Sequence, residues 1–249
     1  MRYLLILSLL IGISDVRAQS SFRKNTSNQN AWVMYFGNHK FSERWGWHAE
    51  AQFRRHDFLS ESQQLLLRTG IEYYSPNGNR FTGGYAFVRT HPYGEFAVPQ
   101  AFPEHRIWQQ FLTSQTFGKF KLAHRYRLEQ RFIGNATTGE MKDGRYENRF
   151  RYMIKATYGI SDALFLAAYE EIFVNFGKEV GFNLFDQNRA YAALGFTVSP
   201  TLKIELGYLY QAVQLRSLDI SAEPKSRIEN NHTLQAGVFF NVPLYSNGE

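Results

Sequence analysis

In residues 118–133, the odd and the even positions differ in the kind of residue that they hold. The odd positions from 119 to 131 hold Lys, Lys, Ala, Arg, Arg, Glu and Arg, and the even positions from 120 to 132 hold Phe, Leu, His, Tyr, Leu, Gln and Phe. A β-strand sends alternate side chains to opposite faces, so the segment predicts one charged face and one mostly apolar, aromatic face. Residues 145–158 repeat the pattern. Long strands of this kind suit a sheet that closes around a polar interior and turns its apolar face to lipid.

The first residues have the features of an export signal. Arg2 precedes an apolar run from Leu4 to Ile13, and Val16 and Ala18 stand at the recognition positions before a cleavage site. The run is about ten residues long, which is too short for a helix that crosses a hydrocarbon core of about 30 Å. We therefore expect residues 1–18 to be a signal peptide that is cleaved near Ala18, with an uncleaved anchor as the alternative.

The composition agrees with an exported barrel. The chain has 22 Phe, 15 Tyr and 4 Trp, which make it 16% aromatic, and no cysteine. The absence of cysteine excludes a disulfide framework, zinc–thiolate sites and a cysteine nucleophile. Mean hydropathy is −0.39, but lipid-facing and lumen-facing residues cancel in such averages. The net charge of +6 could suggest nucleic acid. Because Arg and Lys lie at strand parity beside Glu, and because the chain is exported, we expect no nucleic-acid partner.

Eleven segments have strand-like patterns: 31–40, 45–55, 62–74, 80–90, 104–116, 119–133, 145–159, 163–175, 187–198, 202–215 and 229–241. Their connections alternate between short and long, which is typical of outer-membrane barrels with short periplasmic turns. Single-chain bacterial barrels have even strand numbers. We therefore predict an all-β, transmembrane, antiparallel up-and-down β-barrel of about 12 strands (10–12). Residues 31–249 form the barrel, and residues 19–30 are a flexible N-terminal segment or a weak first strand.

Parity also predicts which charged side chains point inward. We call this predicted set the lumen charge lattice: Glu50, Arg54, Arg68, Glu72, Glu104, Arg106, Arg125, Arg127, Glu129, Arg131, Glu147, Arg149, Arg151, Glu171, Arg189 and Glu205. One interpretation is a purely structural set of cross-strand ion pairs, since buried charges need partners. The other is a porin-like lumen whose excess of arginine attracts small anionic solutes. Besides outer-membrane lipid, such a solute is the partner that we expect.

Loop 91–103 is rich in aromatic residues and proline. It either folds over the barrel mouth and contacts a ligand, or it packs on itself beside an aromatic girdle. The four tryptophans, Trp32, Trp45, Trp47 and Trp108, fit interface anchors or lumen fillers.

An outer-membrane lipid hydrolase is the alternative from a different functional class. It needs a serine nucleophile, a histidine base and an orienting polar group. His232 and Asn188 are candidates, but His232 has lipid-side parity and no serine occupies a suitable inward position nearby. The carboxylates of Glu170 and Glu171 face opposite sides of one strand, which is unsuitable for paired acid–base chemistry. We expect no catalytic residues, metal or cofactor.

A secreted soluble β-sandwich that serves as a binding module is a third class. Predicted strands of 13–15 residues argue against it, since strands in soluble proteins are usually about five or six residues long.

Several short motifs are shared with one known family. They are Asn-Ala-Trp at 30–32, Gln-Phe-Arg-Arg at 52–55, Gln-Leu-Leu-Leu-Arg-Thr-Gly at 64–70, Gly-Gly-Tyr at 83–85, Glu-His-Arg-Ile-Trp-Gln-Gln at 104–110 and Arg-Tyr-Arg-Leu-Glu-Gln-Arg at 125–131. In these the chain resembles the domain-of-unknown-function 2490 family, outer-membrane β-barrel proteins mainly of Bacteroidetes-type Gram-negative bacteria. The resemblance covers essentially the whole mature chain. It implies the barrel and the outer membrane, and it supplies no activity.

Overall fold

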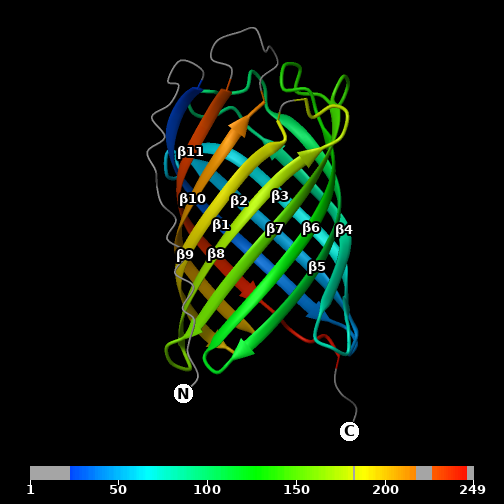
Figure 1. The fold of residues 1–249 in the computed structure, drawn as a ribbon, viewed down its shortest axis with the longest axis vertical. Helices are drawn as coiled ribbons and strands as arrows, with labels where there is room; N and C mark the ends of the chain where they lie inside the picture. The colour runs from blue at the N-terminus through cyan, green and yellow to red at the C-terminus, as the bar shows by residue number, and fades with distance from the viewer. Residues whose placement is uncertain (1–22, 182, 217–225, 246–249) are drawn as a thin grey trace, which may run out of the picture.

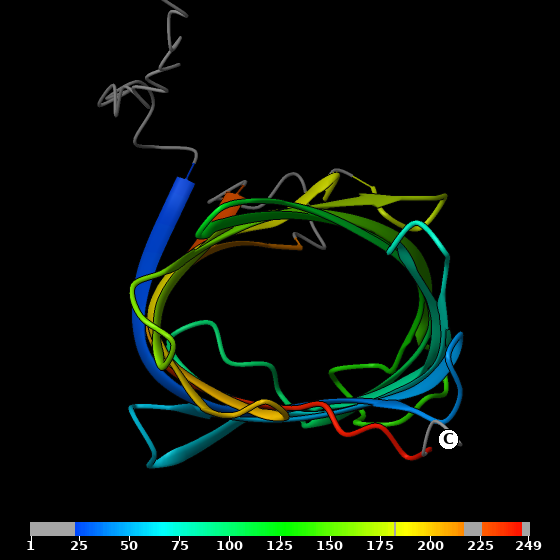
Figure 2. The same cartoon turned by 90° about the horizontal axis from the view of Figure 1, so that it is seen from below.

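The computed structural model describes residues 23–181, 183–216 and 226–245, and the expected signal peptide and its cleavage site lie outside them. Eleven strands in these ranges form one closed barrel (Figures 1 and 2). They are β1 (Arg23–Lys40), β2 (Trp45–His56), β3 (Glu61–Tyr74), β4 (Arg80–Thr90), β5 (Phe102–Phe117), β6 (Phe120–Ile133), β7 (Arg145–Gly159), β8 (Leu164–Phe176), β9 (Phe185–Ser199), β10 (Leu202–Leu215) and β11 (Ser226–Phe240). Within the described ranges, no helix is long and apolar enough to cross a membrane.

The seam of the barrel is parallel. Every strand pairs in antiparallel fashion with its neighbours in sequence, but β1 pairs with β11 in parallel, from Arg23 opposite Ser226 to Gly37 opposite Phe240. Eleven strands in an up-and-down order leave the first and the last running in the same direction, so an odd number requires this seam. The prediction of a closed all-β barrel is confirmed, and the count of eleven lies within the predicted range of 10–12. The preferred count of twelve and the wholly antiparallel order were wrong.

Residues 23–30 explain the error in the count. They do not form a separate first strand but extend β1 to 18 residues. Asn28 and Asn30 are buried, and both donate hydrogen bonds to the side-chain oxygen of Asn231 on β11, at 3.0 and 3.1 Å. Polar side chains that bond inside the lumen thus hold this weakly patterned segment in the wall.

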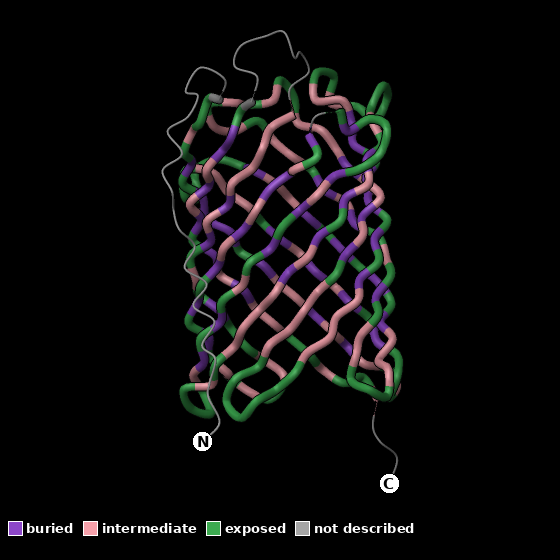
Figure 3. The backbone as a smooth tube through the Cα atoms, viewed as in Figure 1, coloured by how far each residue is buried: buried purple, intermediate pink, exposed green. Residues whose placement is uncertain are grey.

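The two faces of the wall have opposite chemistry. Burial alternates along the strands (Figure 3), and charged side chains are buried inside while large apolar side chains are exposed outside. Phe53, Ile71, Ile107 and Leu206 are each more than half exposed. A single sheet closed on itself has no second sheet against which to bury that outer face, which contradicts the predicted alternative of a soluble β-sandwich.

Inward-facing glycines let large rings lie flat against the wall. A Cβ atom on Gly195 would stand 2.1 Å from the ring of Phe165, its cross-strand neighbour on β8. A Cβ on Gly70 would stand 3.0 Å from the indole of Trp108, which is fully buried. Glycine therefore creates the space in which bulky side chains fill part of the lumen.

Candidate functional site: a charged lumen

The barrel encloses a cavity of about 680 Å³. Its lining runs from loop residues Phe96 to Pro99 at one end to Asn38 and Arg80, near the strand ends at the other. Thirteen arginines and Lys155 line it, against six carboxylates. Spread along an apolar band of about 25 Å, this volume averages roughly 27 Å² in cross-section. Glu72, Glu147 and Glu129 are buried against Arg80, Arg145 and Arg149 of this lining, which makes fourteen cationic side chains against nine carboxylates. The lumen thus has room for small solutes and a net excess of positive charge.

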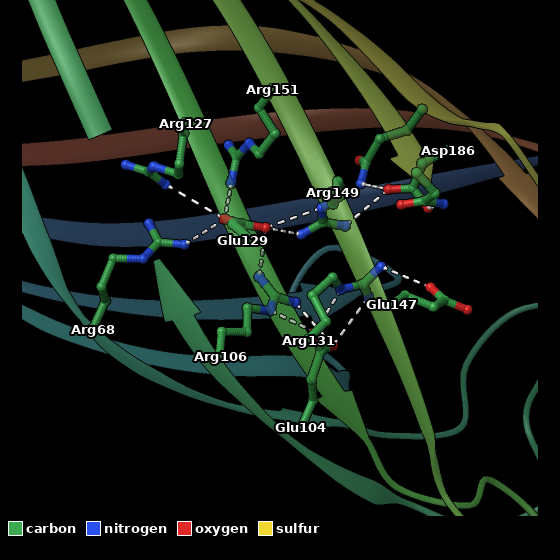
Figure 4. A network of polar contacts seen from close by, with 12 residues as sticks. Arg68, Glu104, Arg106, Arg127, Glu129, Arg131, Glu147, Arg149, Arg151 and Asp186 are labelled. Carbon is green, nitrogen blue, oxygen red and sulfur yellow. Dashed lines mark hydrogen bonds and ion pairs between the residues drawn. The ribbon is translucent and has the colours of Figure 1, made fainter. Parts of the chain in front are cut away.

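Glu129 on β6 is the centre of the ion-pair network (Figure 4). Its carboxylate is fully buried, and five guanidinium groups converge on it from β3, β5, β6 and β7. The contacts are Arg149 at 2.5 Å, Arg151 at 2.8 Å, Arg68 at 3.5 Å, and Arg106 and Arg127 at 3.9 Å each. Four of these five arginines also pair with a second carboxylate, Glu50, Glu104, Asp186 or Glu171, so Glu129 joins separate ion pairs into one network.

Glu104 on β5 holds a second cluster. Arg106 contacts its two oxygens at 2.6 and 3.0 Å, and Arg131 contacts the same two oxygens at 2.6 and 3.1 Å. Such two-point pairing fixes both guanidinium planes as well as their charges. Arg131 also reaches Glu147 at 3.5 Å, so the cluster joins β5, β6 and β7.

Fourteen of the sixteen residues of the lumen charge lattice take part in ion pairs. Further pairs are Glu50–Arg68 at 2.7 Å, Glu72–Arg80 at 3.1 Å, Glu147–Arg145 at 2.7 Å, Glu147–Arg216 at 2.9 Å, Glu171–Arg125 at 2.6 Å, Glu171–Arg151 at 2.8 Å and Glu205–Lys155 at 2.7 Å. Arg54 and Arg189 are the exceptions, since neither has a described carboxylate at ion-pair distance. Both line the cavity and stack on the indole of Trp32.

Two buried carboxylates, Asp186 and Glu229, are not among the residues that parity predicts for the lumen. Asp186 accepts a hydrogen bond from Arg149 at 2.8 Å, although its parity on β9 points outward. The register shifts between Phe173 and Val174 of β8, so Asp186 is the extra residue of a β-bulge and turns inward. Glu229 has inward parity on β11 and is the first residue of the predicted segment 229–241, where a strand boundary hides the alternation.

Loop 91–101 folds into the mouth. The Tyr93 hydroxyl donates to Glu229 of β11 at 3.0 Å, and Glu95 pairs with Lys24 of β1 at 2.5 Å. Burial and the nearby Glu229 carboxylate raise the pKa of Tyr93 above its usual range. The hydrogen bond from Lys24 lowers the pKa of Glu95. The loop is thus tied to the β1–β11 seam and narrows the entrance, rather than packing only on itself.

The other predicted positions divide between the two faces. Trp32 and Trp108 fill the lumen, whereas Trp45 and Trp47 are exposed on the outside. Glu171 points inward, and Glu170 lies outside with a hydrogen bond from Asn188.

The histidine and asparagine proposed for the hydrolase alternative do not bond to each other in the structure. His232 bonds to Tyr208 on the outer face, and among the described residues no histidine ring bonds to a serine. Nor do these residues include a group of three or more His, Asp or Glu that could hold a metal ion.

A closed β-barrel with an apolar exterior and an arginine-rich lumen defines the structural class of this protein. Residues 29–221 match the family described as "Protein of unknown function (DUF2490)", and the chain belongs to that family. This agrees with the resemblance seen in the sequence motifs.

Two solved structures are similar to the chain at 10% identity each. A NanC porin structure gives a TM-score of 0.47 and covers 85% of this chain and 98% of its own. Outer-membrane expressed OmpT of Vibrio cholerae gives a TM-score of 0.38 and covers 68% of this chain and 51% of its own. These similarities are low, and no residue-level correspondence follows from them. No curated protein matches the sequence.

Proposed function

We propose that this protein is an integral outer-membrane β-barrel that binds small anionic solutes and passes them through its lumen. The exposed apolar face, the long tilted strands and the export signal support the location. The lumen supports the solute class: its fourteen cationic side chains outnumber the nine carboxylates that line it or pair with them, and this single observation carries the proposal.

The ion pairs explain how such a lumen stays folded while remaining cationic. Paired carboxylates hold most guanidinium groups in fixed positions on the wall, as Glu104 does with Arg106 and Arg131. A field from fixed charges in a narrow, low-dielectric passage concentrates counter-ions, here anions. Small anions would be drawn in, and small cations would be repelled.

Solute uptake by proteoliposomes tests the proposal. Folded protein is reconstituted into vesicles, and swelling is recorded with an anionic, a neutral and a cationic solute of similar size. We expect the anionic solute to enter fastest. Equal rates for all three would contradict the role assigned to the arginines.

A purely structural role in the envelope is the second candidate. The fully buried hub at Glu129 favours it, since long side chains from several strands meet there across the lumen. Vesicles that contain folded protein and admit none of the three solutes would select this role.

A further inference from the structure

Arg54 on β2 and Arg189 on β9 are held by neutral partners. The Nε and Nη2 atoms of Arg54 donate to the Gln52 side-chain oxygen at 3.0 and 2.6 Å, and its Nη1 atom donates to Gln64 at 2.6 Å. The Nη2 and Nε atoms of Arg189 lie 3.1 and 3.3 Å from the side-chain oxygen of Gln211, when that amide is oriented to accept hydrogen bonds from them. Amides fix the two guanidinium groups in place, and neither group has a carboxylate at ion-pair distance within the part of the chain that the structure describes.

The indole of Trp32 brings the two charges together, although β2 and β9 are not neighbours in the barrel. The guanidinium carbon of Arg54 lies 4.1 Å from the ring centroid, and that of Arg189 lies 5.3 Å from it. Trp32 is itself fixed, because it is buried and its Nε1 donates to Gln63 at 2.7 Å. The two guanidinium carbons are therefore at most about 9.4 Å apart.

This upper bound includes the separations at which one oxyanion pairs with both groups. With N–H···O distances of 2.7–2.9 Å, a paired carboxylate carbon lies about 4 Å from a guanidinium carbon, so one carboxylate contacts two guanidinium groups whose carbons are up to about 8 Å apart. Arg54 is two residues from the end of β2 and Arg189 is four residues from the start of β9, so the place lies near the loop-bearing end of the lumen.

Part of the cavity wall nearby is apolar. Val213 and Leu215 of β10 and Tyr169 of β8 line the cavity and are only partly buried. Val213 is two residues from Gln211, the cross-strand neighbour of Arg189. An inorganic anion gains nothing from such a wall, whereas an organic acid can place its carboxylate at the arginines and its carbon skeleton on the apolar side chains.

We propose that Arg54 and Arg189 form a binding site for the carboxylate of a small organic acid, with Tyr169, Val213 and Leu215 receiving its apolar body. The site rests on the proposed function, because the lumen must admit a small anion. Excess positive charge alone would not discriminate among small anions, whereas this site would favour organic acids.

Binding of hexanoate, acetate and inorganic phosphate to folded protein in detergent, measured by calorimetry, tests the site. Hexanoate should bind about tenfold or more tightly than acetate, since its additional methylene groups are buried. R54Q and R189Q should each weaken hexanoate binding about tenfold or more, because each removes a charge-assisted contact. R55Q is the matched control: it removes the same charge from the next residue, whose side chain is exposed and bonds to Leu59 and Ser62.

The outcomes separate the site from the function. Equal affinity for hexanoate and phosphate would overturn the ligand class, and equal loss in R55Q and R54Q would overturn the site. Heat-dependent gel mobility shows which variants are folded. If R54Q does not fold, R54K replaces it in the binding experiment, and weaker hexanoate binding is expected because lysine cannot make a two-point contact. Wild-type protein that passes anions but binds no hexanoate would contradict the site alone. Protein that binds hexanoate but passes no solute would contradict the proposed passage alone.

Discussion

Replacing Glu129 with glutamine tests whether a lattice of opposite charges holds the lumen together. The carboxylate is fully buried and has guanidinium groups at distances from 2.5 to 3.9 Å. At an effective dielectric constant of 20, a pair of unit charges 4 Å apart interacts by about 4 kcal/mol. Part of this is offset by the cost of burying the carboxylate. Breaking a buried ion pair from one side typically costs about 3–5 kcal/mol, because the partner charge is left uncompensated.

We therefore expect E129Q to lower the free energy of unfolding by about 3–5 kcal/mol. Equilibrium unfolding in denaturant from lipid vesicles, followed by tryptophan fluorescence, measures this as a shift of the midpoint at unchanged slope. E170Q is the matched control, since it makes the same chemical change on an exposed carboxylate of the outer face whose hydrogen-bond partner is Asn188.

The control should be no less stable than the wild type, because glutamine removes a charge from a face turned to lipid. Adding R127Q to E129Q should restore part of the loss, because it removes one of the five crowded cations. Equal stability of E129Q and the wild type, or a greater loss in E170Q, would refute the inward assignment of Glu129.

Three further perturbations test separate parts of the structure. Arg149→Leu leaves both Glu129 and Asp186 without their closest cation, so it should cost about 3–5 kcal/mol of unfolding free energy; wild-type stability would show that the lattice contributes nothing. Leu128→Arg puts a charge on the outer face and should cost about 2–4 kcal/mol if the residue lies near the bilayer midplane, and normal insertion and unfolding would contradict a lipid-facing Leu128. Acidification should release loop 91–101: the pKa of Glu95 is lowered from 4.5 by Lys24, so its contact is present above pH 4.5 and is lost as the pH falls through the lowered value. Acid slows amide exchange itself, so the protection of the loop amides is compared after correction for the intrinsic exchange rate at each pH. Protection should fall to that of Glu95→Gln, whose loop is already loose at neutral pH, and identical protection in both proteins at neutral pH would count against the tether.

Much of the wall could be predicted from parity because a strand has a side-chain period of two. The segment 80–90 coincides with β4, and 202–215 with β10, and most other predicted ends lie within two residues of the observed ones. Alternation is a local property, and a closed barrel preserves it along each strand.

The failures arise where the structure depends on more than one strand. The bulge that turns Asp186 inward is set by the pairing of β8 with β9, so the local alternation gives no sign of it. The parallel seam depends on which strands meet last, and residues 23–30 lack the apolar alternation that marks the other strands.

The candidate site was predicted in its composition but not in its geometry. Parity places Arg54 and Arg189 inside, yet it cannot show that both lie against the indole of Trp32, because β2 and β9 are separated by three strands in the barrel. An arginine pairs with a carboxylate only where the fold brings the two together across the lumen, and such partners are distant in sequence.

The reversal potential of folded protein in a planar bilayer, recorded across a potassium chloride gradient, tests the central claim most directly. Steady current with a reversal potential that reports preference for chloride is the expected result, because fixed arginine charges dominate the cavity surface. A reversal potential that reports preference for potassium, or silence from correctly folded protein, would contradict an anion-passing lumen.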